Sequence, residues 1–160
     1  MLTENEIVQT LVEYLSREGY RIDKQLTTLE QGIDIDAIHL ATGRRLLIEA
    51  KGGTSSKEGT ARFGKPFSTN QAKSHVAVAF YCGAKMLQRY TSESAQVALA
   101  FPDDKNHRGF VESISAALRR LGITVYFVDH NRNVRIFAPG DATPPELLSG
   151  VSFRQVCVTP

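Results

Sequence analysis

The stretch LLIEAKG, residues Leu46–Gly52, joins an apolar run typical of a β-strand to two charged side chains at its end. Side chains alternate between the two faces of a strand, so Glu49 and Lys51 share one face and Leu46, Ile48 and Ala50 share the other. An E-x-K triplet on a solvated strand is most often a surface ion pair, and inward charges that protect an edge strand are a second structural explanation. Because this triplet closes a strongly apolar strand, a functional role is favoured.

The preceding strand, with the sequence GIDIDAI, strengthens that interpretation. Its two acidic residues, Asp34 and Asp36, project from a single face. A tight hairpin through Thr42-Gly43 would place Asp36 opposite Glu49 and Asp34 opposite Lys51. Directly opposed side chains on neighbouring strands have Cβ atoms about 5 Å apart. The two strands together therefore predict a cluster of carboxylates beside a lysine.

Carboxylates this close repel one another unless a cation neutralises them, and oxygen ligands suit Mg²⁺ or Mn²⁺. We expect Asp36 and Glu49 to be the principal metal ligands and catalytic carboxylates, with the Ala50 carbonyl oxygen as a further ligand. Asp34 is either a second ligand or a partner for Lys51. Lys51 would orient or help deprotonate a water for attack on phosphorus. The pattern predicts a phosphodiester-hydrolysis site.

Composition limits the class of protein. The 160 residues, 42% hydrophobic and 22% charged, predict one globular domain over residues 1–160, with no clear pattern over 139–160. The net charge of +2 permits a polyanionic partner without requiring one. Cys82 and Cys157 show no zinc-site or disulfide spacing, and no signal peptide, membrane span or phosphate-binding loop motif is found. A soluble, cytoplasmic protein without a nucleotide cofactor is predicted.

The order of predicted elements indicates an α/β fold. A Thr3–Glu6 capping box begins a first helix that ends at Gly19, and a long polar loop spans residues 52–69. A helix follows that loop, with Ser68 or Thr69 as its cap, and the apolar strand 97–101 and a helix ending at Gly122 come next. The remaining predicted strands lie near residues 20–28, 32–38, 46–48, 123–128 and 134–137. Helices interleaved with a central mixed sheet predict a three-layer α/β/α sandwich.

The loop after Lys51 and the start of the next helix contain several basic and polar side chains. Flexible basic loops beside a phosphate-cleaving centre are suited to contact the nucleic-acid backbone, although an ordinary solvated loop explains them equally well. Gln71 and His75 either face the site or are simply exposed. The candidate nucleic-acid-binding residues are Lys57, Arg62, Lys65, Gln71 and Lys73.

At these residues the sequence resembles the PD-(D/E)XK nuclease superfamily, which has the restriction-endonuclease-like fold. Gly32-Ile33-Asp34 is similar to the G-x-D of Mrr-type restriction enzymes, whereas Asp36 with Glu49-x-Lys51 is similar in spacing to archaeal Holliday-junction resolvases. The resemblance covers roughly residues 3–130 in element order. The sequence departs from the family pattern by offering two candidate aspartates where one is usual.

The resemblance implies a Mg²⁺-dependent DNA endonuclease of the restriction, repair or recombination type. It also implies a metal-approaching glutamate on the first helix, for which Glu4 is the best match and Glu6 the second. A homodimer would allow one site per chain to cut both DNA strands. The alternatives are a non-catalytic DNA-binding or assembly module that keeps the fold, and a nuclease acting on RNA.

Overall fold

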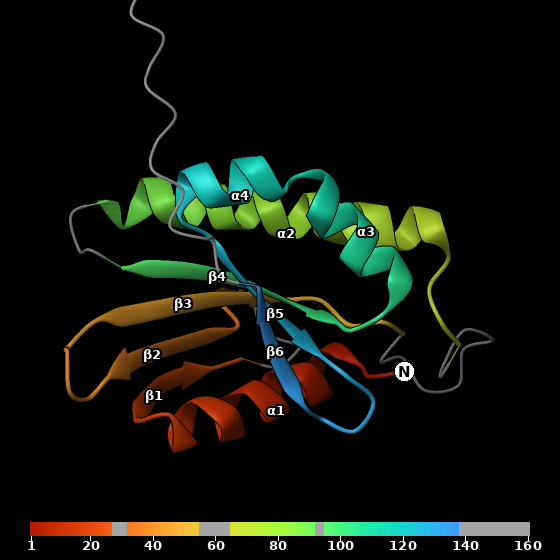
Figure 1. Cartoon of the computed structure of the whole chain (residues 1–160). Coiled ribbons are helices and arrows are strands. Elements are labelled where there is room, and N and C mark those ends of the chain that lie inside the picture. Colours follow the sequence, from red (N-terminus) through yellow and green to blue (C-terminus); the bar gives the residue numbers. More distant parts are fainter. Residues whose placement is uncertain (27–31, 55–64, 92–94, 138–160) are drawn as a thin grey trace, which may run out of the picture.

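The computed structural model describes residues 1–26, 32–54, 65–91 and 95–137. A six-stranded sheet forms its centre, in the order β1-β2-β3-β4-β5-β6 (Figure 1). The β3-β4 and β4-β5 pairs are parallel, and the other neighbouring pairs are antiparallel. The strands are β1 (Tyr20–Gln25), β2 (Ile35–His39), β3 (Arg45–Ala50), β4 (Gln96–Pro102), β5 (Thr124–Val128) and β6 (Val134–Phe137).

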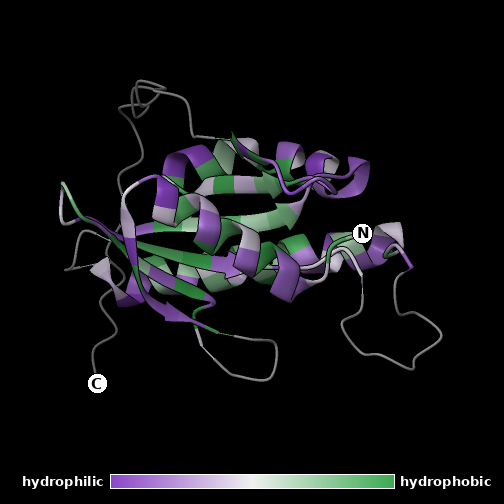
Figure 2. Cartoon of the chain, turned by 90° about the horizontal axis from the view of Figure 1, so that it is seen from below, coloured by the Kyte–Doolittle hydropathy of each residue, from purple (hydrophilic) through white to green (hydrophobic). Residues whose placement is uncertain are grey.

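Helices cover both faces of this sheet. The helix α1 (Glu4–Arg17) packs on one face, and α2 (Thr69–Arg89), α3 (Lys105–Ser113) and α4 (Ser115–Leu121) lie over the other. Each side has its own buried apolar cluster, and Figure 2 shows the hydrophobic residues concentrated on the strands between the helices. The predicted three-layer α/β/α sandwich with a mixed sheet is confirmed. No helix within the described ranges is long and apolar enough to cross a membrane.

Local sequence explains where the first two helices begin. The Thr3 hydroxyl accepts from the Glu6 N–H, and the Glu6 carboxylate accepts from the Thr3 N–H at 2.8 Å. Ser68 and Gln71 form the same reciprocal arrangement at the start of α2. These bonds satisfy backbone N–H groups that have no partner inside the first helical turn. The predicted cap Thr3 is confirmed, and of the two candidates Ser68 and Thr69 the cap of α2 is Ser68.

The predicted single helix before Gly122 is two helices, and this is a correction. The Asp104 side chain accepts hydrogen bonds from the N–H groups of Asn106 and His107, so α3 begins at Lys105. At Ile114, φ of −112° leaves the helical range and separates α3 from α4. Gly122 ends α4 in the left-handed region with φ of 67°, a conformation that glycine adopts without a Cβ penalty.

The pairing of β2 with β3 also differs from the prediction. Ile35 pairs with Ile48 and Asp36 with Leu47, so the predicted opposition of Asp36 with Glu49 is wrong, as is that of Asp34 with Lys51. The connection is longer than a two-residue hairpin, because the His39 N–H donates to the Arg44 carbonyl at 2.9 Å. The register is displaced by two residues relative to the prediction. Since side chains alternate with a period of two, each residue still projects from its predicted face.

Candidate active site

Lys51 lies at the centre of a charged group where β3 ends. Its Nζ is 2.8 Å from Glu49 Oε1 and 3.7 Å from Glu4 Oε2. It also donates to the Ala50 carbonyl oxygen at 2.9 Å. β3 supplies Glu49 and positions Lys51, while α1 supplies Glu4. Residues far apart in the sequence therefore meet at one ammonium group.

Asp34 joins this group from the segment just before β2. Its Oδ2 accepts a 2.7 Å hydrogen bond from the Ala50 N–H, which places the carboxylate beside the last residue of β3. Burial raises the pKa of Asp34 to about 6, against the lowering effect of the Ala50 N–H, and the nearby Glu49 charge raises it further. We call Glu4, Asp34 and Glu49 the carboxylate cluster.

Glu4 reaches this cluster because the start of α1 lies directly against the backbone after β3. A Cβ added to Gly52 would lie 2.5 Å from the Glu4 backbone nitrogen, closer than any side chain permits. The Gly53 N–H also donates to the Leu2 carbonyl at 2.8 Å. Burial raises the pKa of Glu4, the Lys51 charge opposes this effect, and the Glu49 charge adds to it. Glycine at position 52 thus allows the close approach that positions Glu4.

The electrostatic balance of the site favours binding of a further cation. Burial acts to lower the pKa of Lys51, but its hydrogen bond to Glu49 and the charges of the carboxylate cluster outweigh burial and raise it. Lys51 is consequently an ammonium group at neutral pH. One ammonium cannot neutralise three carboxylates, and the Glu49 charge adds to the effect of burial, the main cause, in raising the pKa values of Asp34 and Glu4.

Asp36 has a different environment. Its two carboxylate oxygens accept from Arg45 at 2.9 and 2.7 Å, forming a bidentate ion pair. The Arg45 guanidinium also lies over the Tyr90 ring, 4.9 Å from its centroid. The register that led us to prefer Asp36 as the principal metal ligand is not the observed one. Of the two aspartates, Asp34 is the one that accepts a hydrogen bond from Ala50, the residue that follows Glu49.

The side chains at the site fit a hard divalent cation by their chemistry. The carboxylates of Asp34 and Glu49 and the Ala50 carbonyl are oxygen donors of the kind that Mg²⁺ and Mn²⁺ prefer. In the present arrangement the Lys51 ammonium contacts the Glu49 and Ala50 oxygens. Within the described residues no three His, Cys, Asp or Glu side chains are already arranged to hold a metal ion. Cation binding would thus involve rearrangement around Lys51.

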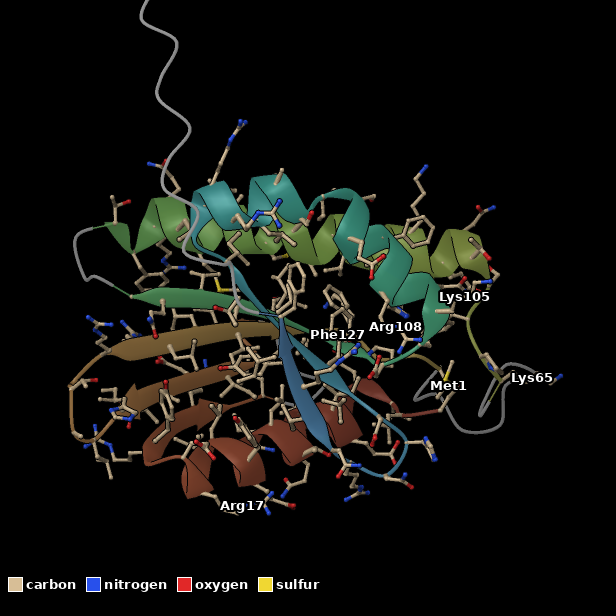
Figure 3. The ribbon with its side chains drawn as sticks, in the orientation of Figure 1. Met1, Arg17, Lys65, Lys105, Arg108 and Phe127 are labelled. Atoms are coloured by element: carbon tan, nitrogen blue, oxygen red, sulfur yellow. The ribbon has the colours of Figure 1, made fainter. Side chains whose placement is uncertain are left out.

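The other predicted site residues are dispersed. Glu6 is held in the capping box of α1, and the Gln71 side chain accepts from the Ser68 N–H at 3.1 Å in the capping box of α2. Lys65 and Lys73 are exposed, and Lys65 points away from the body of the protein (Figure 3). Lys57 and Arg62 lie outside the described residues.

One side chain, Cys82, lies beside Glu49 although its sequence pattern did not indicate this position. Cys82 lies among apolar positions of α2, which predicts a core thiol, but it is only half-buried. Burial raises the pKa of the Cys82 thiol, and the charge of Glu49 and a hydrogen bond to its carboxylate raise it further. Only the tertiary contact between α2 and β3 identifies it as a neighbour of the cluster.

A histidine network supports the backbone after Lys51. His75 Nδ1 lies 3.2 Å from the Gly52 carbonyl oxygen, and the Phe67 ring packs edge-on against the imidazole. Nearby, buried His107 bonds through Nδ1 to Asp104 at 2.6 Å, while its Nε2 has no hydrogen-bond partner among the described groups. In the sequence, only the position of His75 near the start of a helix indicated that it could face the site. No sequence feature indicated the pairing of Asp104 with His107.

Comparison with known proteins finds little similarity. No protein-family model matches the chain, and no curated protein matches it in sequence. The solved structure of SfsA from Pyrococcus furiosus, in complex with Ca²⁺, is similar to it with a TM-score of 0.35 and 16% sequence identity. The match covers 81% of this chain and 58% of that one, so the chain spans little more than half the length of SfsA.

Proposed function

We propose that the protein is a Mg²⁺- or Mn²⁺-dependent phosphodiesterase that cleaves DNA. The observation that carries the proposal is the meeting of Glu4, Asp34 and Glu49 around Lys51 at the end of β3. Such a group of partly buried carboxylates beside a lysine is suited to bind a divalent cation together with a negatively charged phosphate.

Each residue has a proposed role. Asp34 and Glu49, with the Ala50 carbonyl, would hold the cation, and Glu4 would add negative charge at its edge. When bound, the cation supplies Lewis-acid stabilisation of charge that develops on the phosphoryl oxygens. Lys51 is a hydrogen-bond donor because its pKa is raised, so it orients the attacking water or the phosphate rather than removing a proton.

The roles of the two aspartates follow from their contacts. Asp34 is desolvated, and the Ala50 N–H and the Lys51 charge offset this burial only in part, which leaves its carboxylate available to a cation. Asp36 is neutralised by Arg45, a bidentate pair that fixes the start of β3 against β2. We therefore assign Asp34 to the reaction and Asp36 to the support of the sheet, in place of the original preference.

A cleavage panel tests the proposal. Linear duplex, single-stranded, branched and methylated DNA, with an RNA of matched sequence, would be incubated with Mg²⁺ or Mn²⁺. We expect the parent to cleave at least one DNA, and Glu49→Gln and Lys51→Met to reduce the rate at least about 100-fold, since each removes a group at the reacting centre. Thermal melting of each variant would show that it remains folded.

Three outcomes would contradict the assignment. Equal cleavage by the parent and Lys51→Met would exclude the proposed site. Cleavage of RNA alone would make the protein a ribonuclease. No cleavage of any substrate, together with salt-sensitive DNA binding and no calorimetric Mn²⁺ binding, would indicate a DNA-binding module without catalysis.

A further inference from the structure

A cavity of about 730 Å³ extends from Glu49 toward the end of α2. One wall is formed by residues of β1, β2, β3 and the segment before β2, and the other by the C-terminal half of α2. It is open along this side because, within the sheet, α2 packs mainly against β3 and β4. Pockets that enclose a small ligand usually measure about 300 to 1000 Å³. A space of this size suits a nucleotide rather than a duplex.

The charges that line the cavity favour an anion. Asp36 is already paired with Arg45, and Glu49 with Lys51. Lys24, Lys85 and Arg89 also line it, and no carboxylate among the described residues lies within salt-bridge distance of them. The cavity therefore offers three uncompensated cations, spaced along its walls, to a phosphate backbone.

The apolar part of the lining favours a base. Tyr90 closes the far end of the cavity, with the guanidinium groups of Arg45 and Arg89 at 4.9 and 5.6 Å from its ring centroid. Ile33 and Met86 add aliphatic surface. Unpaired bases stack on aromatic rings and on guanidinium planes, and they need such apolar surfaces when they leave a duplex.

We propose that this cavity binds an unpaired nucleotide next to the phosphate held at Glu49, and we call it the nucleotide pocket. Lys85 and Arg89 contact the flanking phosphates, and Tyr90 and Arg45 contact the base. The substrate class is accordingly DNA with a single-stranded or unpaired segment at the cut site. The inference rests on the proposed function for the position of the scissile phosphate, but binding to the pocket requires no catalysis.

Binding without metal tests the pocket separately from cleavage. Fluorescence anisotropy in EDTA would compare a labelled single-stranded DNA 12-mer with a duplex of the same sequence. We expect the parent to bind the single strand at least about tenfold more tightly. Lys85→Ala/Arg89→Ala should weaken single-strand binding about tenfold and lower the slope of log K against log salt by about 1.4, since each phosphate contact on a single strand contributes about 0.7.

Matched variants distinguish DNA binding by the pocket from a general effect of positive charge. Arg119→Ala/Arg120→Ala removes the same charge from the exposed last turn of α4 and should leave binding unchanged. Tyr90→Phe retains the ring and should bind as the parent does, whereas Tyr90→Leu should bind several-fold more weakly. Melting temperatures of both Tyr90 variants would identify any loss of folding.

The possible results are distinct. Equal loss in the α4 and pocket double variants, equal affinity for the single strand and the duplex, or no binding by the parent would overturn the inference. Selective loss in the pocket variants supports it, even if the parent cleaves nothing and the proposed function fails. Conversely, metal-dependent cleavage that survives unchanged in the pocket double variant, with unchanged binding, would retain the function and reject the pocket.

Discussion

The carboxylate of Asp34 accepts a 2.7 Å hydrogen bond from the backbone N–H of Ala50. This bond joins the segment before β2 to the last residue of β3. The two residues are distant in the sequence, so no local motif indicates their contact. It also keeps a carboxylate buried beside two other acids, at a cost to the folded state that the raised pKa of Asp34 records.

Replacement of that carboxylate should stabilise the protein above neutral pH. Asp34→Asn retains an oxygen that can accept from Ala50 but removes the buried charge. Because the pKa of Asp34 is about 6 when folded and 3.8 in its ordinary state, its ionisation opposes folding as pH rises between these values. We expect a gain on the order of 2 kcal/mol in the free energy of unfolding at pH 8.

The pH dependence of this gain in stability serves as the control, because it shows whether the buried charge is its cause. At about pH 3, below both pKa values, Asp34 is largely protonated in the folded and the unfolded protein and little of the penalty remains, so the parent and Asp34→Asn should have nearly equal stability. Urea unfolding at about pH 3 and pH 8 measures both differences. A gain of the same size at the two pH values would show that the buried charge is not its source.

The two aspartates should differ in catalysis. We expect Asp34→Asn to lower metal-dependent DNA cleavage at least about 100-fold, because it removes a proposed cation ligand. Asp36→Asn should retain most of the cleavage rate, since the Asp36 carboxylate is bound to Arg45. Measurement of the rate over a range of Mg²⁺ concentrations would compare the variants, and a greater loss in Asp36→Asn would reverse the assignment.

Gly52 should be intolerant of any side chain. Gly52→Ala would place a Cβ 2.5 Å from the Glu4 nitrogen and 3.0 Å from the Thr3 carbonyl carbon, so α1 would have to move. We expect a loss of roughly 2 to 4 kcal/mol in stability, with loss of activity as Glu4 is displaced.

A second glycine supplies the comparison. A Cβ on Gly109, within α3, would have no atom within 4 Å outside its own helix backbone, and alanine favours helix over glycine. Gly109→Ala should therefore be neutral or stabilising by up to about 1 kcal/mol. Denaturant unfolding of the two variants tests the contrast, which fails if Gly52→Ala is as stable as Gly109→Ala.

The hydrogen bond from His75 to Gly52 should matter more to activity than to folding. Burial lowers the pKa of His75, so the ring is neutral at pH 7 and donates through Nδ1 to the Gly52 carbonyl. We expect His75→Ala to reduce the cleavage rate about tenfold by loosening the backbone beside Lys51. His75→Asn, whose amide can donate from a similar position, should recover part of the rate.

The recovery by asparagine distinguishes the hydrogen bond from simple packing against Phe67. Both variants remove the ring, so both lose its edge-on contact with Phe67. Equal rates in His75→Ala and His75→Asn, at matched melting temperatures, would argue against the hydrogen bond.

The alternation of side chains predicted the faces of β2 and β3 correctly. Apolar Ile35 and Ile48 are fully buried on the α1 side, and Glu49 projects toward α2, as the period of two requires. The register could not be predicted in the same way, because it depends on the conformation of the connection between the strands. A four-residue connection and a two-residue turn give the same pattern of faces.

The residues around the site were predicted only where a local motif exists. Glu6 was correctly identified as a capping residue from the spacing of Thr3 and Glu6, whereas Glu4, which lies near Lys51, was expected at the site only because the family resemblance implies a glutamate on the first helix. Cys82 and the Asp104–His107 pair have no such spacing. Their positions follow from the packing of α2 and α3 over the sheet, which depends on contacts distant in the sequence.

The spacing of Asp34 and Asp36 has a consequence for how such a site changes during evolution. Because the two residues share a face, insertion of two residues into the connection between β2 and β3, with its four-residue turn retained, would bring Asp36 to the place that Asp34 now occupies beside Ala50. The chemistry at that place would be unchanged, although a different codon would encode the ligand. A D-x-D strand thus makes the site tolerant of a two-residue insertion that would destroy a site built on a single aspartate.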